Sequence, residues 1–222
     1  MTLLDKFAVA AEIRENLESG GHDPTRVVID EILSPTEGMV EGRLTILAGT
    51  NNYLGMTFDP ACIEAGRRAI ETMGTGTTGS RMANGSYAAH AALEDEIADF
   101  FGMQYAMVFS TGYAANLGML TALCGRKDTV LLDADAHASL YDGCAMSGAN
   151  VFRFRHNDVE SLDKRLQRLG ESDRDCLVVV VGLYCVMGDF APLAGMVEIT
   201  HRHGALILVD EAHSLGVFGE RG

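Results

Sequence analysis

Short apolar runs alternate with segments of helical periodicity along most of the chain. Five of these runs have the length of strands and are rich in Val, Leu, Ile or aromatic residues: residues 105–110, 129–133, 151–154, 176–181 and 205–210. The segments between them have the length and pattern of helices: residues 113–123, 138–147, 159–169 and 194–203. Strands buried on both faces have such continuous apolar sequences, and helical crossovers make neighbouring strands parallel. The pattern therefore predicts an α/β fold with a mainly parallel sheet flanked by helices.

The N-terminal part has a sparser pattern. It predicts an amphipathic helix, a short strand and two further helices, at residues 1–20, 44–47, 60–72 and 88–101. Pro60 supports the start of the third element, because proline is favoured in a first helical turn. We assign residues 1–45 to an N-terminal helix and arm, and residues 46–222 to an incomplete large domain that contains the sheet.

Composition excludes several classes of protein. The formal charge of the 222 residues is −14, which disfavours binding to a nucleic-acid backbone. The five cysteines form no CxxC pair and read as reduced thiols of a cytoplasmic protein: Cys62, Cys124, Cys144, Cys176 and Cys185. The longest apolar run, residues 177–187, is too short to cross a bilayer, and the N-terminus lacks a secretory pattern. We expect a soluble protein with no metal site and at most a peripheral contact with a membrane surface.

A glycine turn joins the predicted strand at 105–110 to the next helix. Its sequence, residues 109–116 (FSTGYAAN), places the amides of Gly112 and Tyr113 at a helix N-terminus. Unpaired amides and the helix dipole would together form a cradle for a phosphate. An ordinary strand-to-helix turn has the same pattern, so the motif alone leaves both readings open.

Two further predicted strands end in residues with catalytic chemistry. The apolar strand 205–210 ends in Asp210, and His213 follows three residues later. A carboxylate 4 Å from a cationic ring nitrogen is worth roughly 4 kcal/mol at an effective dielectric of about 20, or about three pKa units. Asp210 could therefore keep a cofactor ring protonated, or simply cap a helix. His137, after the strand 129–133, could stack on a planar cofactor or lie in solvent.

The glycine-rich loop at residues 74–81 (GTGTTGSR) formally matches a dinucleotide-binding fingerprint. We reject that reading, because a helix rather than a strand precedes the loop. The glycines would instead let the backbone approach a ligand or a neighbouring subunit. Arg81 is then a candidate anion contact, although a solvent-facing arginine fits equally well.

Together these motifs give the chain a resemblance to the α-oxoamine synthase family, which comprises PLP-dependent enzymes of fold type I (PLP, pyridoxal 5′-phosphate). The similarity extends along essentially the whole chain, through residues 52–55 (NYLG), 74–81, 110–116 (STGYAAN), 137–139 (HAS), 188–189 (GD) and 210–216 (DEAHSLG). Within that family the chain is most similar to the bacterial serine palmitoyltransferase branch, in residues 34–37 (SPTE), 55–60 (GMTFDP), 79–82 (GSRM), 132–135 (LDAD) and 151–157 (VFRFRHN).

The resemblance implies a role for each matching cofactor residue. Gly112 and Tyr113 would hold the phosphate of PLP through their amides. His137 would stack on the pyridine ring, Asp210 would pair with the ring nitrogen, and His213 would hydrogen-bond the phenolic oxygen. These three side chains are the catalytic residues that the resemblance implies.

The resemblance also implies substrates and an assembly. Asn52 and His137 would lie near the amino-acid carboxylate, and Ser80 and Arg81 would approach the site across a homodimer interface. The implied reaction is the condensation of L-serine with a long-chain acyl-CoA, palmitoyl-CoA, to 3-ketodihydrosphinganine, CoA and CO2. This reaction is the first step of sphingolipid synthesis.

The chain departs from the family in its lysines. Lys6, Lys127 and Lys164 are its only lysines, and none lies in a context that matches the family's catalytic lysine. The family's C-terminal small domain also has no counterpart in these residues. We therefore expect a piece of a longer protein that is not a competent enzyme by itself.

A second departure concerns residues 181–186 (VGLYCV). Val181 stands where the family usually has Glu, and Cys185 where it usually has a Ser that lies close to the cofactor ring. Cys185 could fill the same space, but a thiol is a weaker hydrogen-bond donor. Two alternatives therefore stay open: a family member that uses glycine or alanine with a different acyl-CoA, and a catalytically silent partner subunit.

Overall fold

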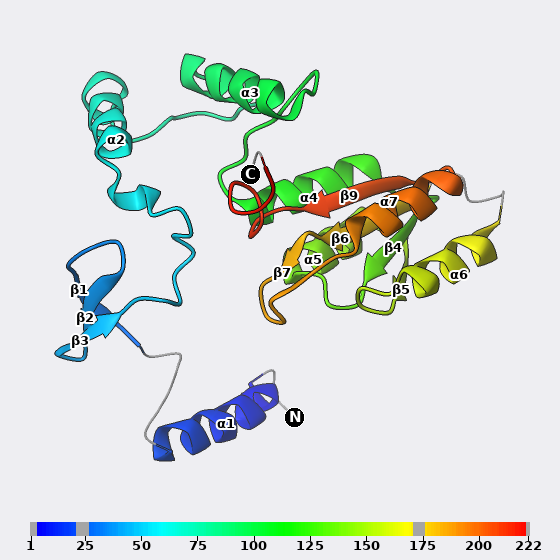
Figure 1. The fold of residues 1–222 in the computed structure, drawn as a ribbon, viewed down its shortest axis with the longest axis horizontal. Coiled ribbons are helices and arrows are strands. Elements are labelled where there is room, and N and C mark those ends of the chain that lie inside the picture. The colour runs from blue at the N-terminus through cyan, green and yellow to red at the C-terminus, as the bar shows by residue number, and fades with distance from the viewer. Residues whose placement is uncertain (1–3, 21–26, 171–175, 221–222) are drawn as a thin grey trace. The chain divides into compact units, whose positions relative to one another are not determined.

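The computed structural model describes residues 4–20, 27–170 and 176–220. The chain forms two compact units, Met1–Gly76 and Thr77–Gly222 (Figure 1). The division expected at residue 45 stays a prediction. In the described part of the chain, no helix is long and apolar enough to span a membrane.

The described residues of the first unit form three helical segments and a small antiparallel sheet. The helical segments are a 3-10 turn (Asp5–Phe7) that leads into α1 (Ala8–Ser19), the 3-10 turn η3 (Met56–Phe58), and α2 (Pro60–Met73). The sheet has the order β1 (Ile29–Ile32), β2 (Glu37–Val40), β3 (Arg43–Ile46). The sequence predicted only β3. The missed signal is the Glu41-Gly42 turn, where both residues have positive φ (50° and 72°), as a tight hairpin between β2 and β3 requires.

The second unit is built on a four-stranded sheet with all strands parallel. Its order is β5 (Asn150–Phe154), β4 (Thr129–Asp133), β6 (Cys176–Val181), β9 (Leu206–Asp210). Every residue of β4 and β6 is buried, which accounts for their uninterrupted apolar sequence. The predicted parallel α/β sheet is therefore confirmed.

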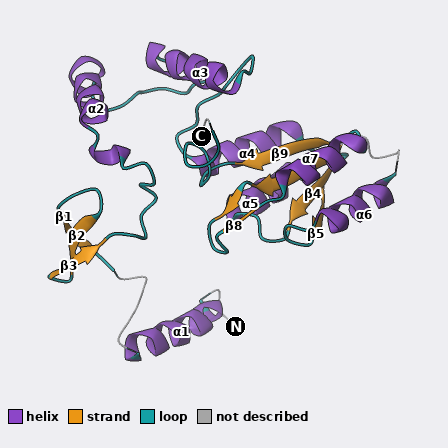
Figure 2. Cartoon of the chain, in the orientation of Figure 1, coloured by secondary structure: helices purple, strands orange, loops and turns teal. Residues whose placement is uncertain are grey.

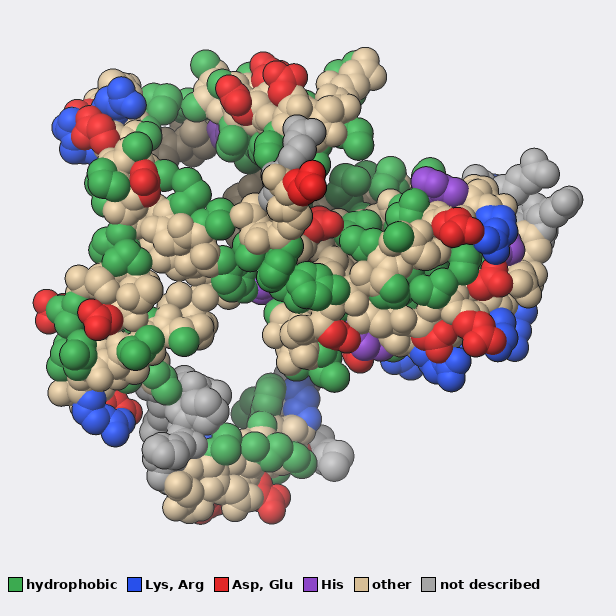
Figure 3. Space-filling model, in the orientation of Figure 1, with side chains coloured by type: hydrophobic (Ala, Val, Ile, Leu, Met, Phe, Trp, Pro, Cys, Tyr) green, Lys and Arg blue, Asp and Glu red, His purple; other side chains and the backbone are tan. Residues whose placement is uncertain are grey.

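Helices cover both faces of this sheet (Figure 2). On one face α4 (Gly112–Leu123) packs against α5 (Ala138–Ser147), and on the other α6 (Val159–Leu169) packs against α7 (Leu193–Arg202). Leu162 and Leu166 of α6 are buried, and Figure 3 shows acidic and basic side chains together over its outer surface. Right-handed crossovers explain this arrangement, because the chain moves from β4 to β5 in one direction and from β5 through β6 to β9 in the other.

The strand predicted at residues 105–110 is wrong. The segment has no strand structure and follows α3 (Ala88–Phe101) as an extended loop. Side chains take the place of a neighbouring strand: the Glu94 carboxylate accepts from the Val108 amide at 2.9 Å, and Arg81 donates to the Val108 carbonyl at 3.5 Å. An apolar run can form a strand only where a partner strand offers hydrogen bonds, and the four described parallel strands pair with one another.

Candidate active site

The second unit holds a cavity of about 740 Å³ beyond the carboxyl ends of its strands. Its lining residues lie within the four segments 112–116, 134–139, 181–187 and 209–215. The strands β4 and β6 lie side by side, yet their crossovers lead to opposite edges of the sheet. In open α/β sheets such a switch point leaves a crevice between the two diverging loops. Topology therefore places the pocket here.

The N-terminus of α4 lies at the pocket. The Thr111 hydroxyl caps the helix by accepting from the amide of Ala114 at 3.0 Å. Among the described residues, the amides of Gly112 and Tyr113 have no hydrogen-bond acceptor, and both residues line the pocket. Free amides at the positive end of a helix dipole form an anion site. No arginine or lysine is among the described residues that line the pocket, so a phosphate here would depend on these amides.

The side chain of Tyr113 ties α4 to α5. Its hydroxyl donates to the Asp142 carboxylate. This hydrogen bond, together with desolvation, raises the pKa of Tyr113, so the phenol stays protonated at neutral pH. The contact holds the two helices together next to the anion site.

His137 stands at the start of α5 and caps that helix. Its Nδ1 accepts from the Ser139 amide at 3.2 Å and lies 2.8 Å from the Ser139 hydroxyl. Because Nδ1 accepts a hydrogen bond, the proton of the neutral ring belongs on Nε2. The ring is thereby fixed in the pocket wall by the helix that it caps.

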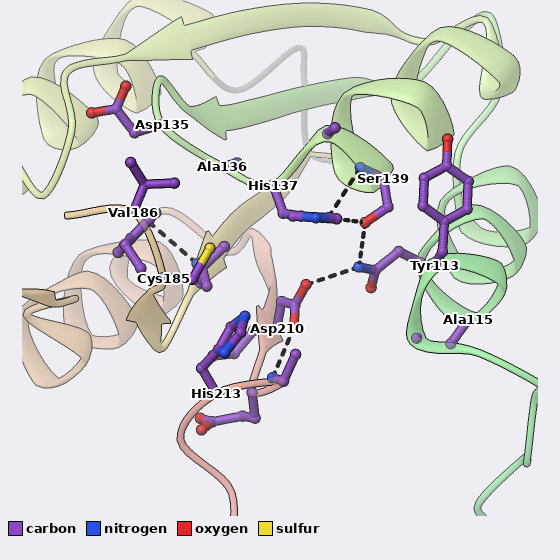
Figure 4. A pocket seen from close by; sticks show the side chains of 18 of the residues that line it. Tyr113, Ala115, Asp135, Ala136, His137, Ser139, Cys185, Val186, Asp210 and His213 are labelled. Atoms are coloured by element: carbon purple, nitrogen blue, oxygen red, sulfur yellow. Dashed lines mark hydrogen bonds between the residues drawn. The ribbon is translucent and has the colours of Figure 1, made fainter. Parts of the chain in front are cut away.

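Asp210 ends β9 with both carboxylate oxygens engaged. Oδ1 accepts from the Ala212 amide at 3.0 Å, and Oδ2 accepts from the side-chain amide of Asn116 at 2.8 Å. The second proton of the same amide goes to the Ser139 hydroxyl at 2.9 Å. A continuous chain of hydrogen bonds therefore runs from Asp210 through Asn116 and Ser139 to His137 (Figure 4).

Asn116 and Ser139 belong to the sequence motifs, but the sequence predicted no role for either residue. One signal was available for Asn116, which lies four residues after Gly112 and therefore on the same face of α4. Ser139 is fully buried, and a buried hydroxyl requires partners.

A short hairpin forms a further wall of the pocket. It consists of β7 (Leu183–Tyr184) and β8 (Asp189–Phe190), and the sequence did not predict it. Tyr184 is 3% exposed, and its hydroxyl accepts from the Val181 amide at 3.2 Å. Cys185 follows at the hairpin turn, exposed and facing the pocket. Val181, where the family usually has Glu, is buried at the end of β6 opposite Asp210.

All six residues predicted to bind the cofactor line this one pocket: Gly112, Tyr113, His137, Cys185, Asp210 and His213. Figure 4 shows the side chains of His137, Cys185, Asp210 and His213 converging from three loops. The structure thus brings together residues that lie as far apart as positions 112 and 213. Their roles toward a cofactor remain proposals.

Of the predicted substrate residues in the second unit, His137 lines the pocket, whereas Ser80 and Arg81 are not among its described lining residues. Arg81 is held by Glu94 in an ion pair at 2.8 Å and by the Ser86 hydroxyl at 3.0 Å. The Ser80 hydroxyl accepts from the Met82 amide at 3.2 Å. Asn52 belongs to the unit Met1–Gly76, where its side chain accepts from the backbone of η3.

The glycines of the loop around Arg81 let its backbone pack on itself. A Cβ on Gly85 would lie 2.2 Å from the carbonyl oxygen of Gly79, and Gly79 has a φ of +91°. The close approach seen in the structure is one within the loop itself. The expected approach to a ligand or a neighbouring subunit is not tested by this contact.

Comparison with known proteins gives consistent matches. A profile described as aminotransferase class I and II matches residues 45–222. The serine palmitoyltransferase of Caulobacter vibrioides is 52% identical over 222 residues, which is 100% of this chain and 55% of that protein. The 8-amino-7-oxononanoate synthase of Geobacter sulfurreducens is 40% identical over 215 residues, covering 97% of this chain and 54% of that protein.

Solved structures agree. A serine palmitoyltransferase from S. paucimobilis with PLP and myriocin bound has a TM-score of 0.95 and 51% identity, covering 99% of this chain and 55% of that one. The Sphingomonas wittichii serine palmitoyltransferase has a TM-score of 0.93 and 54% identity, with the same two coverages. The chain spans about half the length of the curated relatives that it matches.

Proposed function

Because the chain belongs to the aminotransferase class I and II family, we propose that its pocket binds PLP and that the whole protein is a serine palmitoyltransferase. The reaction joins L-serine to palmitoyl-CoA and yields 3-ketodihydrosphinganine, CoA and CO2, the first step of sphingolipid synthesis. One observation carries the proposal. A carboxylate fixed by Asn116 and a pair of unpaired helix amides face the same pocket, as a ring nitrogen and a phosphate would require.

The polar groups of the pocket match the charges of this cofactor. The amides of Gly112 and Tyr113 bind the phosphate, and His137 stacks on the ring. Asp210 keeps the ring nitrogen protonated, an interaction worth roughly 4 kcal/mol at an effective dielectric of about 20. His213 donates to the phenolic oxygen. When bound, PLP accepts the electron pair that is released at the α-carbon of the amino acid.

Other parts of the proposal depend on residues outside the pocket. No lysine lines it, so we place the lysine that anchors PLP beyond these 222 residues. Asn52, Ser80 and Arg81 would act on the substrate in a homodimer. To reach a substrate carboxylate, Arg81 would exchange its ion pair with Glu94 for the new partner. A cytoplasmic location fits the reduced thiols expected from the sequence.

The proposal is tested on the full-length gene product reconstituted with PLP. The visible absorbance band of the bound cofactor is followed while L-serine, glycine, L-alanine and L-threonine are titrated separately. We expect L-serine to change the band at the lowest concentration, and palmitoyl-CoA then to release one CoA and one CO2 per condensation. The absence of a cofactor band would reject PLP binding and favour a catalytically silent partner subunit.

A second function is supported by a specific observation. The 40% identity to an 8-amino-7-oxononanoate synthase, and the Val181 and Cys185 departures, favour a related enzyme with another amino acid and acyl-CoA. In the same titration, a stronger response to glycine or L-alanine than to L-serine would establish this alternative. It would leave the roles of Asp210, His137 and the α4 amides unchanged.

A further inference from the structure

A histidine that the proposed reaction does not use lies behind the hairpin wall of the pocket. His156 follows β5, and only 18% of its side chain is exposed. Its Nδ1 lies 2.9 Å from Oδ1 of Asp133, and its Nε2 lies 3.0 Å from Oδ2 of Asp189. The imidazole therefore bridges the end of β4 and the strand β8.

The two carboxylates determine the charge of this ring. A carboxylate only accepts hydrogen bonds, so both ring nitrogens of His156 must donate, and only the imidazolium can do so. Burial works against the charged form, but the hydrogen bonds to Asp133 and Asp189 outweigh it and raise the pKa of His156. Asp135 adds a further carboxylate oxygen 3.7 Å from Nδ1.

The other polar groups around Asp133 and His156 agree with a positive charge on the His156 ring. Asp133 is fully buried and accepts from the amides of Asp135 and Asn157 at 2.9 and 3.0 Å. The nearby Arg155 is engaged elsewhere, in an ion pair with Asp158 at 2.7 Å. Among the described residues, the His156 imidazolium is thus the cation that balances the buried Asp133 carboxylate.

The same ring also holds the hairpin in place. Its ring makes a T-shaped contact with the ring of Tyr184, with ring centroids 4.4 Å apart and planes at 89°. Tyr184 pairs with Asp189 across the hairpin. The side-chain amide of Asn157 adds hydrogen bonds to Asp189 at 3.0 Å and to the carbonyl of Phe190 at 3.1 Å. Both strands of the hairpin are therefore fastened to the residues that follow β5.

We propose that His156 is a positioning residue that, as an imidazolium between Asp133 and Asp189, clamps the β7–β8 hairpin and thereby fixes Tyr184 and Cys185 in the pocket wall. Tyr184 and Cys185 line the pocket, whereas His156 does not. The inference deepens the proposed function and rests on it, because it assigns the clamp to the cofactor pocket.

The clamp is tested first without cofactor, on the full-length protein. Histidine Cε1 hydrogen–deuterium exchange, read by mass spectrometry, reports the titration of His156. We expect its midpoint to lie above that of an ordinary histidine and to fall in Asp189→Asn, which keeps the shape and removes the charge. We also expect His156→Gln to speed amide exchange in residues 183–190 by at least about tenfold, since a charge-assisted hydrogen bond is lost.

A matched control distinguishes the clamp from a general loss of stability. His203 donates to Asp163 at 2.8 Å, between α7 and α6, and its side chain is 24% exposed, but it does not line the pocket. His203→Gln should leave exchange in residues 183–190 unchanged. A His156 midpoint at or below the ordinary value, or equal hairpin exchange in both variants, would overturn the proposal.

The second test uses PLP affinity against pH. Because protonation is favoured in the folded state, the clamp is complete at low pH and is lost as pH rises through the His156 midpoint. Wild-type affinity should fall across that interval. The His156→Gln variant should bind PLP about tenfold more weakly than wild type at low pH, and its affinity should not fall across that interval. The His203→Gln variant should keep the wild-type fall in affinity. Wild-type protein that binds no PLP would reject the proposed function, while the exchange measurements still decide on the clamp.

Discussion

The side-chain amide of Asn116 donates a 2.8 Å hydrogen bond to the carboxylate of Asp210, although the two residues are 94 positions apart in the chain. The other proton of this amide goes to Ser139, whose hydroxyl lies 2.8 Å from Nδ1 of His137. A single amide on α4 thus orients both the carboxylate proposed for the cofactor nitrogen and the ring proposed to stack on it. Because both amide protons of Asn116 are donated, its side chain cannot rotate without losing a hydrogen bond.

Removal of this amide should loosen the cofactor. We expect Asn116→Ala to weaken PLP binding about tenfold, since a hydrogen bond to a charged group contributes about 1.5–3 kcal/mol and water replaces part of it. Fluorescence titration of the cofactor-free, full-length protein measures the dissociation constant. Asn150→Ala serves as the control, because Asn150 is exposed at the start of β5 and does not line the pocket. An unchanged affinity in Asn116→Ala would remove Asn116 from the site.

The charge of Asp210 should matter more than its shape. Asp210→Asn keeps the side-chain size but removes roughly 4 kcal/mol of ring-nitrogen stabilisation at an effective dielectric of about 20, so we expect kcat/KM to fall about a thousandfold. Release of CoA from palmitoyl-CoA in the presence of L-serine provides the assay. Asp99→Asn, at an exposed site on α3, should retain wild-type activity. A loss of less than tenfold would show that Asp210 does not face the ring nitrogen.

The close packing of α4 on α5 depends on a glycine. A Cβ on Gly143 would lie 2.7 Å from Cδ1 of Leu120 and 3.2 Å from the backbone oxygen of Asn116. We therefore expect Gly143→Ala to lower the free energy of unfolding by about 1–3 kcal/mol, as overpacking does. Gly66, inside α2, has open space, and Gly66→Ala should stabilise the protein by up to about 1 kcal/mol. Urea unfolding of the two variants should show changes of opposite sign.

The cysteines should differ in reactivity with their environment. Burial, and to a lesser degree Cys124, raises the pKa of the Cys144 thiol to about 11. Only the thiolate reacts with iodoacetamide, and the raised pKa keeps Cys144 protonated at pH 8. Cys144 should therefore resist labelling at this pH until the protein unfolds. Cys62 and Cys185 are exposed and should react.

Protection by PLP then locates the cofactor. We expect bound PLP to slow the labelling of Cys185, which lines the pocket, and to leave that of Cys62 unchanged. Mass spectrometry of the digested protein measures both sites in one sample, so Cys62 is an internal control. Equal labelling of Cys185 with and without PLP would place the cofactor away from the hairpin wall.

Local patterns predicted most of the second unit. The helices α3, α5 and α6 and the strands β4 and β6 have the predicted boundaries. Their apolar periodicity and their capping residues are local features, so they can be recognised in the sequence of each segment. The segment 105–110 was wrong for the opposite reason: its apolar pattern is that of a strand, but a strand also needs a partner, and partners come from distant sequence. The β7–β8 hairpin, with two residues per strand, is too short for any periodicity to reveal.

The sequence by itself determined the alternation of helices with the four parallel strands, and the motifs that contain Gly112, His137 and Asp210. Periodicity and capping act over a few residues, so they can be read along the chain. Only the tertiary structure decided that Asn116 joins Asp210 to Ser139, and that His156 stands between Asp133 and Asp189. These contacts depend on which loops meet at the switch point of the sheet, and that geometry is a property of the packed crossovers rather than of any single segment.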